Sequence, residues 1–182
     1  MIRALRGGLL ACLLGACAHP SVAPRGPEPA PGAAAMSRAR TALDAGDSVR
    51  SEQYALLALR QGHSEHEVIM PLVRACLASS RLRAALLYAE PYLRKHPQHV
   101  GLRYLVAAIE LALGHPERAR RELQRVSARR PELPEPYYLD GVIARDAFGD
   151  APAARAQFQR YLAREPDGAH AAEVSAWLSE AP

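Results

Sequence analysis

Two pairs of histidines are the first side chains in this 182-residue sequence whose spacing could serve chemistry. His63 and His66 are three residues apart, and His96 and His99 repeat that spacing, with glutamates close to the first pair. Imidazole and carboxylate side chains suit zinc, so a metal site is one interpretation. The pairs lack the HExxH spacing of a helical zinc site, and polar residues are ordinary in turns, so we expect turn residues and no metal.

The chain offers no recognisable catalytic constellation. Ser21, Ser37, Ser48 and Ser64 lack the glycines of a nucleophile elbow, and no glycine-rich loop is present to hold a phosphate. We therefore expect no enzymatic activity, no cofactor and no small-molecule substrate.

Six arginines gather in one short segment, namely Arg118, Arg120, Arg121, Arg125, Arg129 and Arg130. Ala119, Leu123 and Val126 alternate with them at helical spacing and predict the buried face, which leaves the arginines on an outer, solvated face. Attraction to anionic lipid or lipopolysaccharide phosphate is the alternative interpretation.

The arginine segment is one copy of a pattern that recurs. Gly114 to Pro131 holds a glycine turn, a proline at the first helical position, three inward apolar positions and a final proline. Steps of 34 residues lead back from Pro131 to Pro97 and His63, while the forward step reaches Pro166 only if one residue is inserted near Phe148. This pattern resembles the tetratricopeptide repeat (TPR), which is a helix-turn-helix of 34 residues.

The resemblance implies an all-α fold, an α-solenoid of about four TPR-like helix pairs. The repeats are expected near residues 32–65, 66–99, 100–133 and 134–168, with a capping helix at 169–180. The helices are expected near 34–45, 48–61, 66–79, 82–95, 100–113, 116–129, 135–148, 151–164 and 169–179. Trp177 and Leu178 of the last helix should pack back onto the fourth pair.

Two prolines lie inside predicted helices. Pro71 and Pro91 each remove a backbone donor, which predicts a kink at each position or a late helix start around Pro71. We therefore expect the second repeat to be the most distorted.

The first residues have the layout of a bacterial membrane-targeting signal. Arg3 and Arg6 precede a short apolar run, and Leu14-Gly15-Ala16-Cys17 resembles the lipobox of bacterial lipoproteins. The resemblance implies a signal peptide at 1–16 and lipidation of Cys17, since the alternative match at Cys12 follows a shorter apolar run. Ala18 follows Cys17 in place of a retention aspartate, which implies the outer membrane, facing the periplasm.

Residues 17–33 are rich in proline and predict an extended tether between the lipid and a helical domain at 34–182. Without the arginines of the signal peptide the chain carries 21 basic and 19 acidic residues, so it is nearly neutral and no nucleic-acid partner is expected. Since Cys12 would leave with the signal peptide and Cys17 would be lipidated, Cys76 would have no cysteine partner, and its helical position predicts a small buried side chain.

The resemblance also implies where a partner would bind. In TPR arrays the fifth and ninth residues of each repeat point into the concave groove. Those residues here are Met36, Arg40, Met70, Arg74, Tyr104, Ala108, Tyr138 and Val142. Tyrosine, arginine and methionine are common in binding surfaces, although Met70 and Tyr138 could equally fill space between helices. The clamp that grips chaperone C-termini uses asparagine, which this chain lacks.

These features together predict a membrane-anchored scaffold or assembly factor for a cell-envelope complex, with a peptide or helix of an envelope protein in its groove. One alternative is a structural subunit that docks through its convex, arginine-rich face. Another is an accessory subunit of a cell-wall enzyme.

Overall fold

The computed structural model describes residues 30–180. Helices and short turns make up this part of the chain, and no strand occurs within it. None of the helices in the described range is long and apolar enough to cross a membrane. The predicted signal peptide, the predicted lipidation site Cys17 and most of the predicted tether lie outside the described residues.

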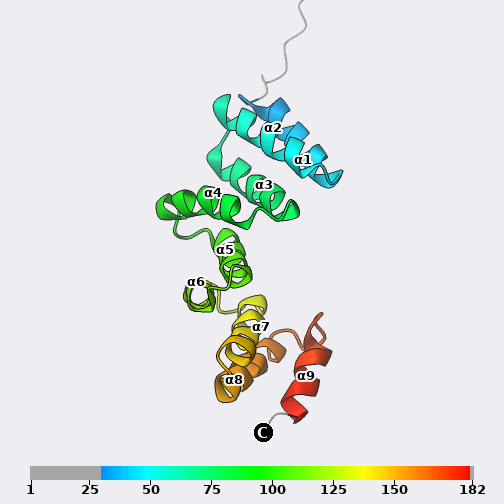
Figure 1. Ribbon diagram of the computed structural model, residues 1–182, viewed down its shortest axis with the longest axis vertical. Helices are drawn as coiled ribbons and strands as arrows, with labels where there is room; N and C mark the ends of the chain where they lie inside the picture. The colour runs from blue at the N-terminus through cyan, green and yellow to red at the C-terminus, as the bar shows by residue number, and fades with distance from the viewer. Residues whose placement is uncertain (1–29, 181–182) are drawn as a thin grey trace, which may run out of the picture.

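The helices follow one another as four hairpin pairs and a final helix. They are α1 (Ala33–Asp44) with α2 (Ser48–Arg60), α3 (Glu65–Ala78) with α4 (Leu82–Lys95), α5 (Val100–Ala112) with α6 (Pro116–Arg129), and α7 (Glu135–Val142), continued by the π-helical turn η1 (Ile143–Ala147), with α8 (Ala151–Leu162), before α9 (Ala171–Glu180). The pairs stack along the long axis of the molecule (Figure 1). The predicted α-solenoid is confirmed, and the helix ends fall within two residues of those predicted.

The turn inside each pair needs a left-handed residue. Gly46, Gly114 and Gly149 occupy this position with φ of 77°, 79° and 63°, which glycine adopts without the steric cost that a Cβ brings. Ser80 holds the same place in the second pair at φ 56°. The recurrence of one backbone conformation explains why glycine marks the repeat in the sequence.

Small residues let the two helices of a pair approach each other. Ala107 of α5 and Ala119 of α6 are both fully buried in one cluster with Leu123. At the matching place in the fourth pair Gly141 of α7 faces Phe158 of α8 so closely that a Cβ would lie 2.5 Å from the ring. The larger phenyl ring is therefore accommodated by the absence of a side chain opposite it.

The inserted residue of the fourth repeat is absorbed by η1. Its hydrogen bonds skip one residue more than those of an α-helix, so that the Phe148 amide donates to the Ile143 carbonyl at 3.3 Å. The insertion expected near Phe148 is thus confirmed. It places the main helical irregularity in the fourth repeat, and the expectation that the second repeat is the most distorted is wrong.

The prolines of the second repeat do not divide its helices. α3 begins at Glu65, six residues before Pro71, so a late start at that proline is wrong. Val68, Ile69 and Leu72 around the proline are all buried, and this packing holds the helix where one hydrogen bond is missing. Pro91 likewise lies inside the continuous α4.

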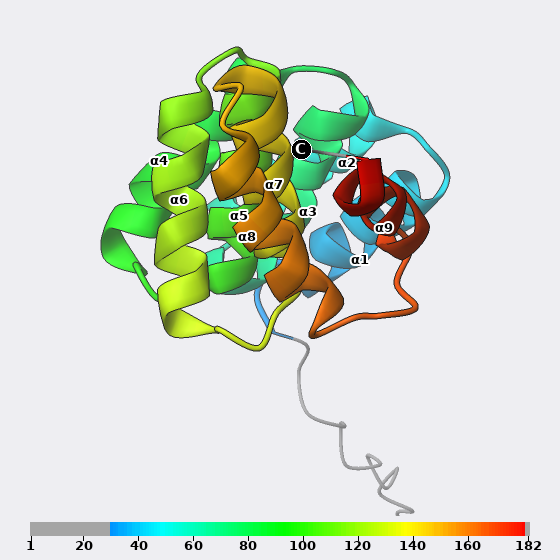
Figure 2. The same cartoon turned by 90° about the horizontal axis from the view of Figure 1, so that it is seen from below.

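α9 covers the end of the stack, as predicted. Trp177 and Leu178 pack against the core of the fourth pair, and the Trp177 ring meets Phe158 edge-on with centroids 5.2 Å apart. Figure 1 shows α9 beside α7 and α8. Seen along the stack, α4 and α6 lie on the outer side, with α3, α5 and α7 inside them (Figure 2).

The close approach of Gly141 to Phe158 can be tested by introducing the residues that the third repeat has at the matching positions. Gly141→Ala should lower the free energy of unfolding by about 1–3 kcal/mol, because the new methyl group overlaps the buried Phe158 ring. Adding Phe158→Leu reproduces the Ala107–Leu123 combination and should recover part of the loss. Urea denaturation followed by circular dichroism measures both. A Gly141→Ala variant as stable as the parent would contradict the close approach.

Candidate protein-binding surfaces

The structure places the predicted groove residues in different environments. Met36 is 2% exposed and lies in the core formed by α1, α2 and α3. Its assignment to a partner-binding surface is therefore a correction: the thioether fills space between helices, because α1 is covered by both α2 and α3.

Charge on the first-helix face comes from two arginines. Arg40 of α1 is exposed and lies 4.0 Å from Glu67 of α3, across the boundary between repeats. Arg74 of α3 is also exposed, and the described residues provide it with no ion-pair partner. A cavity of about 380 Å³ beside Arg40 is also lined by His63 and Glu67, so the first boundary between repeats is polar.

The apolar members of the set are partly exposed. Met70, Ala108 and Val142 each keep some contact with solvent. Tyr104 lines a cavity of about 340 Å³ between α5, α6 and α7, and burial raises the pKa of its hydroxyl. Because they are partly exposed, these four side chains can contact a ligand while they remain packed against their neighbours.

Tyr138 is already engaged by the segment around α9. Its ring stacks on His170 with centroids 3.8 Å apart, and its hydroxyl donates to Glu173 at 3.0 Å. The final helix therefore occupies the last position of the predicted groove, and the eight predicted residues are divided among separate cavities and surfaces.

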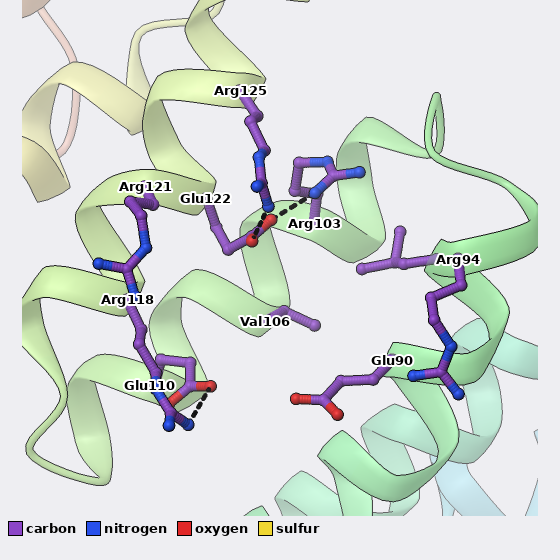
Figure 3. Close-up of a pocket in the computed structure, with 10 residues that line it drawn as sticks. Glu90, Arg94, Arg103, Val106, Glu110, Arg118, Arg121, Glu122 and Arg125 are labelled. Atoms are coloured by element: carbon purple, nitrogen blue, oxygen red, sulfur yellow. Dashed lines mark hydrogen bonds and ion pairs between the residues drawn. The ribbon is translucent and has the colours of Figure 1, made fainter.

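A further groove lies between the second helices α4 and α6, above α5. It has a volume of about 400 Å³ (Figure 3). Glu90 and Arg94 project from α4 on one side, and arginines of α6 project from the other (Figure 3). Leu93 and Val106 add apolar surface to the lining.

Buried ion pairs build part of this lining. Arg103 of α5 has a side chain that is 9% exposed, and it is hydrogen-bonded to Glu122 of α6. A second nitrogen of Arg103 donates to the Pro97 carbonyl at 2.8 Å. Glu122 also pairs with Arg125, so one carboxylate is shared by two guanidinium groups. Such shared contacts fix the position of the groove-lining arginines.

The Glu110 carboxylate of the groove is likewise held in ion pairs. Its side chain is 5% exposed, with His115 Nδ1 at 2.7 Å and Arg118 Nη1 at 3.7 Å. By contrast, Glu90, Arg94 and Arg121 are exposed, and within the described residues none of them has an ion-pair or hydrogen-bond partner. The groove thus presents two arginines and one glutamate that have no ion-pair partner among the described residues.

Another buried pair joins the third and fourth repeats. Arg120 Nε of α6 lies 3.0 Å from Asp140 Oδ1 of α7, and the Asp140 side chain is 9% exposed. The N–H does not point at the oxygen, so the contact is an ion pair without a linear hydrogen bond. Burial raises the pKa of the Asp140 carboxyl, while Arg120 opposes that rise.

The sequence pattern identified the arginines of α6 and missed their partners. Arg103 and Glu110 stand at repeat positions that hold Ile69 and Cys76 one repeat earlier. A charged residue at a position that is apolar elsewhere in the array is the signal that could have identified them. The outer-face expectation also needs correction for Arg120, whose side chain is 28% exposed and paired inward.

The four histidines are grouped differently in the structure from the two pairs in the sequence. His63 bonds Glu67 at 3.0 Å, whereas the rings of His66, His96 and His99 surround the buried Tyr92. The Tyr92 hydroxyl and His66 Nδ1 share a hydrogen bond of 2.6 Å. Across residues 30–180 no three histidine, cysteine or acidic side chains are placed to hold a metal ion.

Cys76 is fully buried in the core, as predicted. Its sulfur lies 3.9 Å from Glu52, and burial, then this carboxylate, raises the pKa of the thiol. A raised pKa leaves the thiol protonated at neutral pH, which suits a packing role.

Stacked helix pairs with exposed side chains on both layers define a helical-repeat protein of the kind that binds other proteins. Residues 77–141 match the family model of the tetratricopeptide repeat. Together with the fold of the described residues, this match shows that the chain is a TPR-containing protein. No curated protein matches the chain by sequence.

Several solved TPR structures have the same fold. A TPR protein from Parabacteroides merdae superposes with a TM-score of 0.73 at 19% identity; the match covers 81% of this chain and 59% of that one, so this chain spans less than two thirds of that protein's length. MamA from Desulfovibrio magneticus gives 0.70 at 17%, covering 80% and 84%. YrrB, described as a TPR protein with an unusual peptide-binding site, gives 0.70 at 14%, covering 80% and 74%. At these identities the likeness concerns the fold.

His99 should make the stability of the stack depend on pH. Its Nδ1 accepts from the Leu102 amide at 3.1 Å and caps α5, and burial, together with His66 and His96, lowers its pKa below the usual value. The unfolded chain then takes up the proton first, so the contribution of His99 is present above about pH 6.5 and is lost as the pH falls below that value.

The test compares two substitutions at this cap. His99→Ala should cost about 1 kcal/mol at pH 7.5 by removing the cap, and His99→Asn should cost less because asparagine also caps helices. In both variants the free energy of unfolding, measured between pH 7.5 and 5, should fall less steeply than in the parent. An unchanged slope in His99→Asn would show that the neutral state of His99 does not support folding.

Proposed function

We propose that this protein is a membrane-anchored scaffold that binds a peptide or helix of an envelope protein on the face formed by its first helices. A TPR fold supports a role in protein–protein interaction. The observation that carries the choice of face is the set of partly exposed apolar side chains on α3 and α5, together with the exposed Arg74 of α3. Extended faces of this kind receive segments of other proteins.

The proposed contact surface centres on the second and third repeats. Arg74 supplies a charge without an ion-pair partner among residues 30–180, Met70 supplies apolar surface one turn before it on α3, and Ala108 supplies apolar surface on α5. Tyr104 adds an aromatic ring that is fixed by its cavity. Arginine and tyrosine are enriched among the residues that contribute most to binding at protein interfaces, which suits them to anchor a partner. The fourth repeat contributes less, because Tyr138 already contacts His170 and Glu173.

The membrane anchor and the envelope location rest on the sequence of the N-terminal region. A lipidated Cys17 followed by a proline-rich spacer would hold the repeat domain away from the bilayer, with its helix faces free for partners. The proposed partner is accordingly a protein of the cell envelope.

A bulky residue on the first-helix face should block the partner. Ala108→Arg adds a long side chain to a partly exposed position of α5, so it should reduce partner capture by at least about tenfold, which corresponds to 1.4 kcal/mol. Quantitative mass spectrometry of proteins that copurify from detergent-solubilised native membranes measures the change. Circular dichroism should show the same helicity as the parent.

The matched control is Ala156→Arg, which makes the same change at an exposed position of α8. This variant should retain the partners of the parent. Equal recovery from Ala108→Arg and the parent would contradict the first-helix face, and equal loss from both variants would show that the effect is not specific to that face.

The anchor is tested by substitution of each candidate cysteine. Cys17→Ser in the full chain should abolish incorporation of radiolabelled palmitate and move the protein from the membrane to the soluble fraction, since the acyl chains provide the attachment. Cys12→Ser is the matched control and should behave as the parent. Label retained in Cys17→Ser would exclude Cys17 as the lipidated residue.

A further inference from the structure

The groove between α4 and α6 is distinct from the face in the proposed function. It opens between two second helices, which lie on the outer side of the stack (Figure 2), whereas the proposed partner face is made by first helices. A ligand in this groove could therefore be bound while the first-helix face is occupied or empty.

Some charged side chains of the groove have ion-pair partners within the protein, and others do not. Glu122 is neutralised by Arg103 and Arg125, and Glu110 is contacted by Arg118 and His115. These pairs occupy two of the three carboxylates of the lining and leave other cations without a partner within residues 30–180. Arg94 on α4 and Arg121 on α6 remain exposed on opposite sides, and the structure gives neither an ion-pair partner among the described residues.

An occupant that spans the groove would meet a guanidinium from each side. Guanidinium groups bind carboxylates, like phosphates, through two parallel hydrogen bonds, so the two arginines favour a ligand that carries such anionic groups. Between these sides Leu93 and Val106 offer apolar contact. Leu87, which is 73% exposed, lies two helical turns before Arg94 on the same face of α4 and extends this apolar surface.

The same features disfavour a lipid surface. A flat anionic bilayer cannot enter a groove, and it would be repelled by the uncommitted carboxylate of Glu90 that stands beside Arg94 (Figure 3). A narrow protein segment can place its acidic residues near the arginines and its neutral residues near Glu90. Charge complementarity therefore selects a protein segment.

We propose that the groove between α4 and α6 binds an acidic, amphipathic segment of a partner protein. Carboxylates of that segment pair with Arg94 and Arg121, and its apolar side chains contact Leu93 and Val106. Glu90 opposes acidic residues placed next to it and so sets where along the segment they can lie.

A defined peptide tests the site with the full chain. The probe is a fluorescein-labelled helical peptide with glutamates along one face and leucines beside them, and its twin carries glutamine at every glutamate. Fluorescence anisotropy at low salt should show binding of the glutamate peptide, with weaker binding as salt is raised and at least about tenfold weaker binding of the glutamine twin. Absence of binding, or equal binding of the two peptides, overturns the proposal.

Substitutions locate the site. Arg94→Gln with Arg121→Gln should weaken binding of the glutamate peptide by at least about tenfold, because both proposed carboxylate contacts are removed. Arg83→Gln with Arg129→Gln is the matched control, since it removes the same charge from exposed positions of the same two helices outside the groove. Equal weakening in the two double variants would show attraction to general positive charge and overturn the site.

A third substitution predicts a change of opposite sign. Glu90→Gln removes the uncommitted anion and should tighten binding of the glutamate peptide about threefold or more. Vesicles of phosphatidylglycerol serve as the competing ligand in a sedimentation assay. If the parent sediments with the vesicles, the Arg94→Gln with Arg121→Gln variant does not, and the peptide does not bind, the groove is assigned to lipid and the proposal is overturned. Ala108→Arg should leave peptide binding unchanged, so failure here and failure of the proposed first-helix face are separate results.

Discussion

The close approach of two helices at a small residue is the constraint on which this structure depends. Ala107 with Leu123 and Gly141 with Phe158 show two solutions to the same requirement, since a smaller residue on one helix admits a larger one on the other. Once each pair is closed in this way, its remaining apolar face can be buried only against the next pair, and stacking follows. The exposed surfaces of both layers, including the groove between α4 and α6, are consequences of that stacking.

Much of the fold could be predicted because each repeat has similar residue types at the same positions. A left-handed turn residue, glycine in three of the four pairs, and small residues at fixed intervals recur with a period of 34 residues, and the one inserted residue near Phe148 appears in the structure as the π-helical turn η1. The effect of Pro71 could not be predicted in the same way. Burial of Val68, Ile69 and Leu72 stabilises α3 through the proline, and that burial depends on neighbouring helices.

The binding surfaces were less predictable, because they depend on pairs of residues that are distant in the sequence. Position in the repeat placed Met36 with Arg40, yet Met36 is covered by two further helices, and Tyr138 is occupied by the segment around α9. The groove between α4 and α6 requires knowing which carboxylates are already paired, and Arg103 with Glu122 is a tertiary contact. Residue types could suggest that arginines bind a partner, but only the arrangement in space shows which arginines already have a carboxylate partner and which do not.

In the proposed function the first helices receive a partner segment. Residue-specific photo-crosslinking in native membranes tests it most directly, with the crosslinker at position 104 or 108 on α5 and, for comparison, at position 156 on α8. We expect reproducible crosslinks to one envelope protein from positions 104 and 108 and none to that protein from position 156. Crosslinks to that protein from position 156 alone would contradict the claim and place the partner on the second helices.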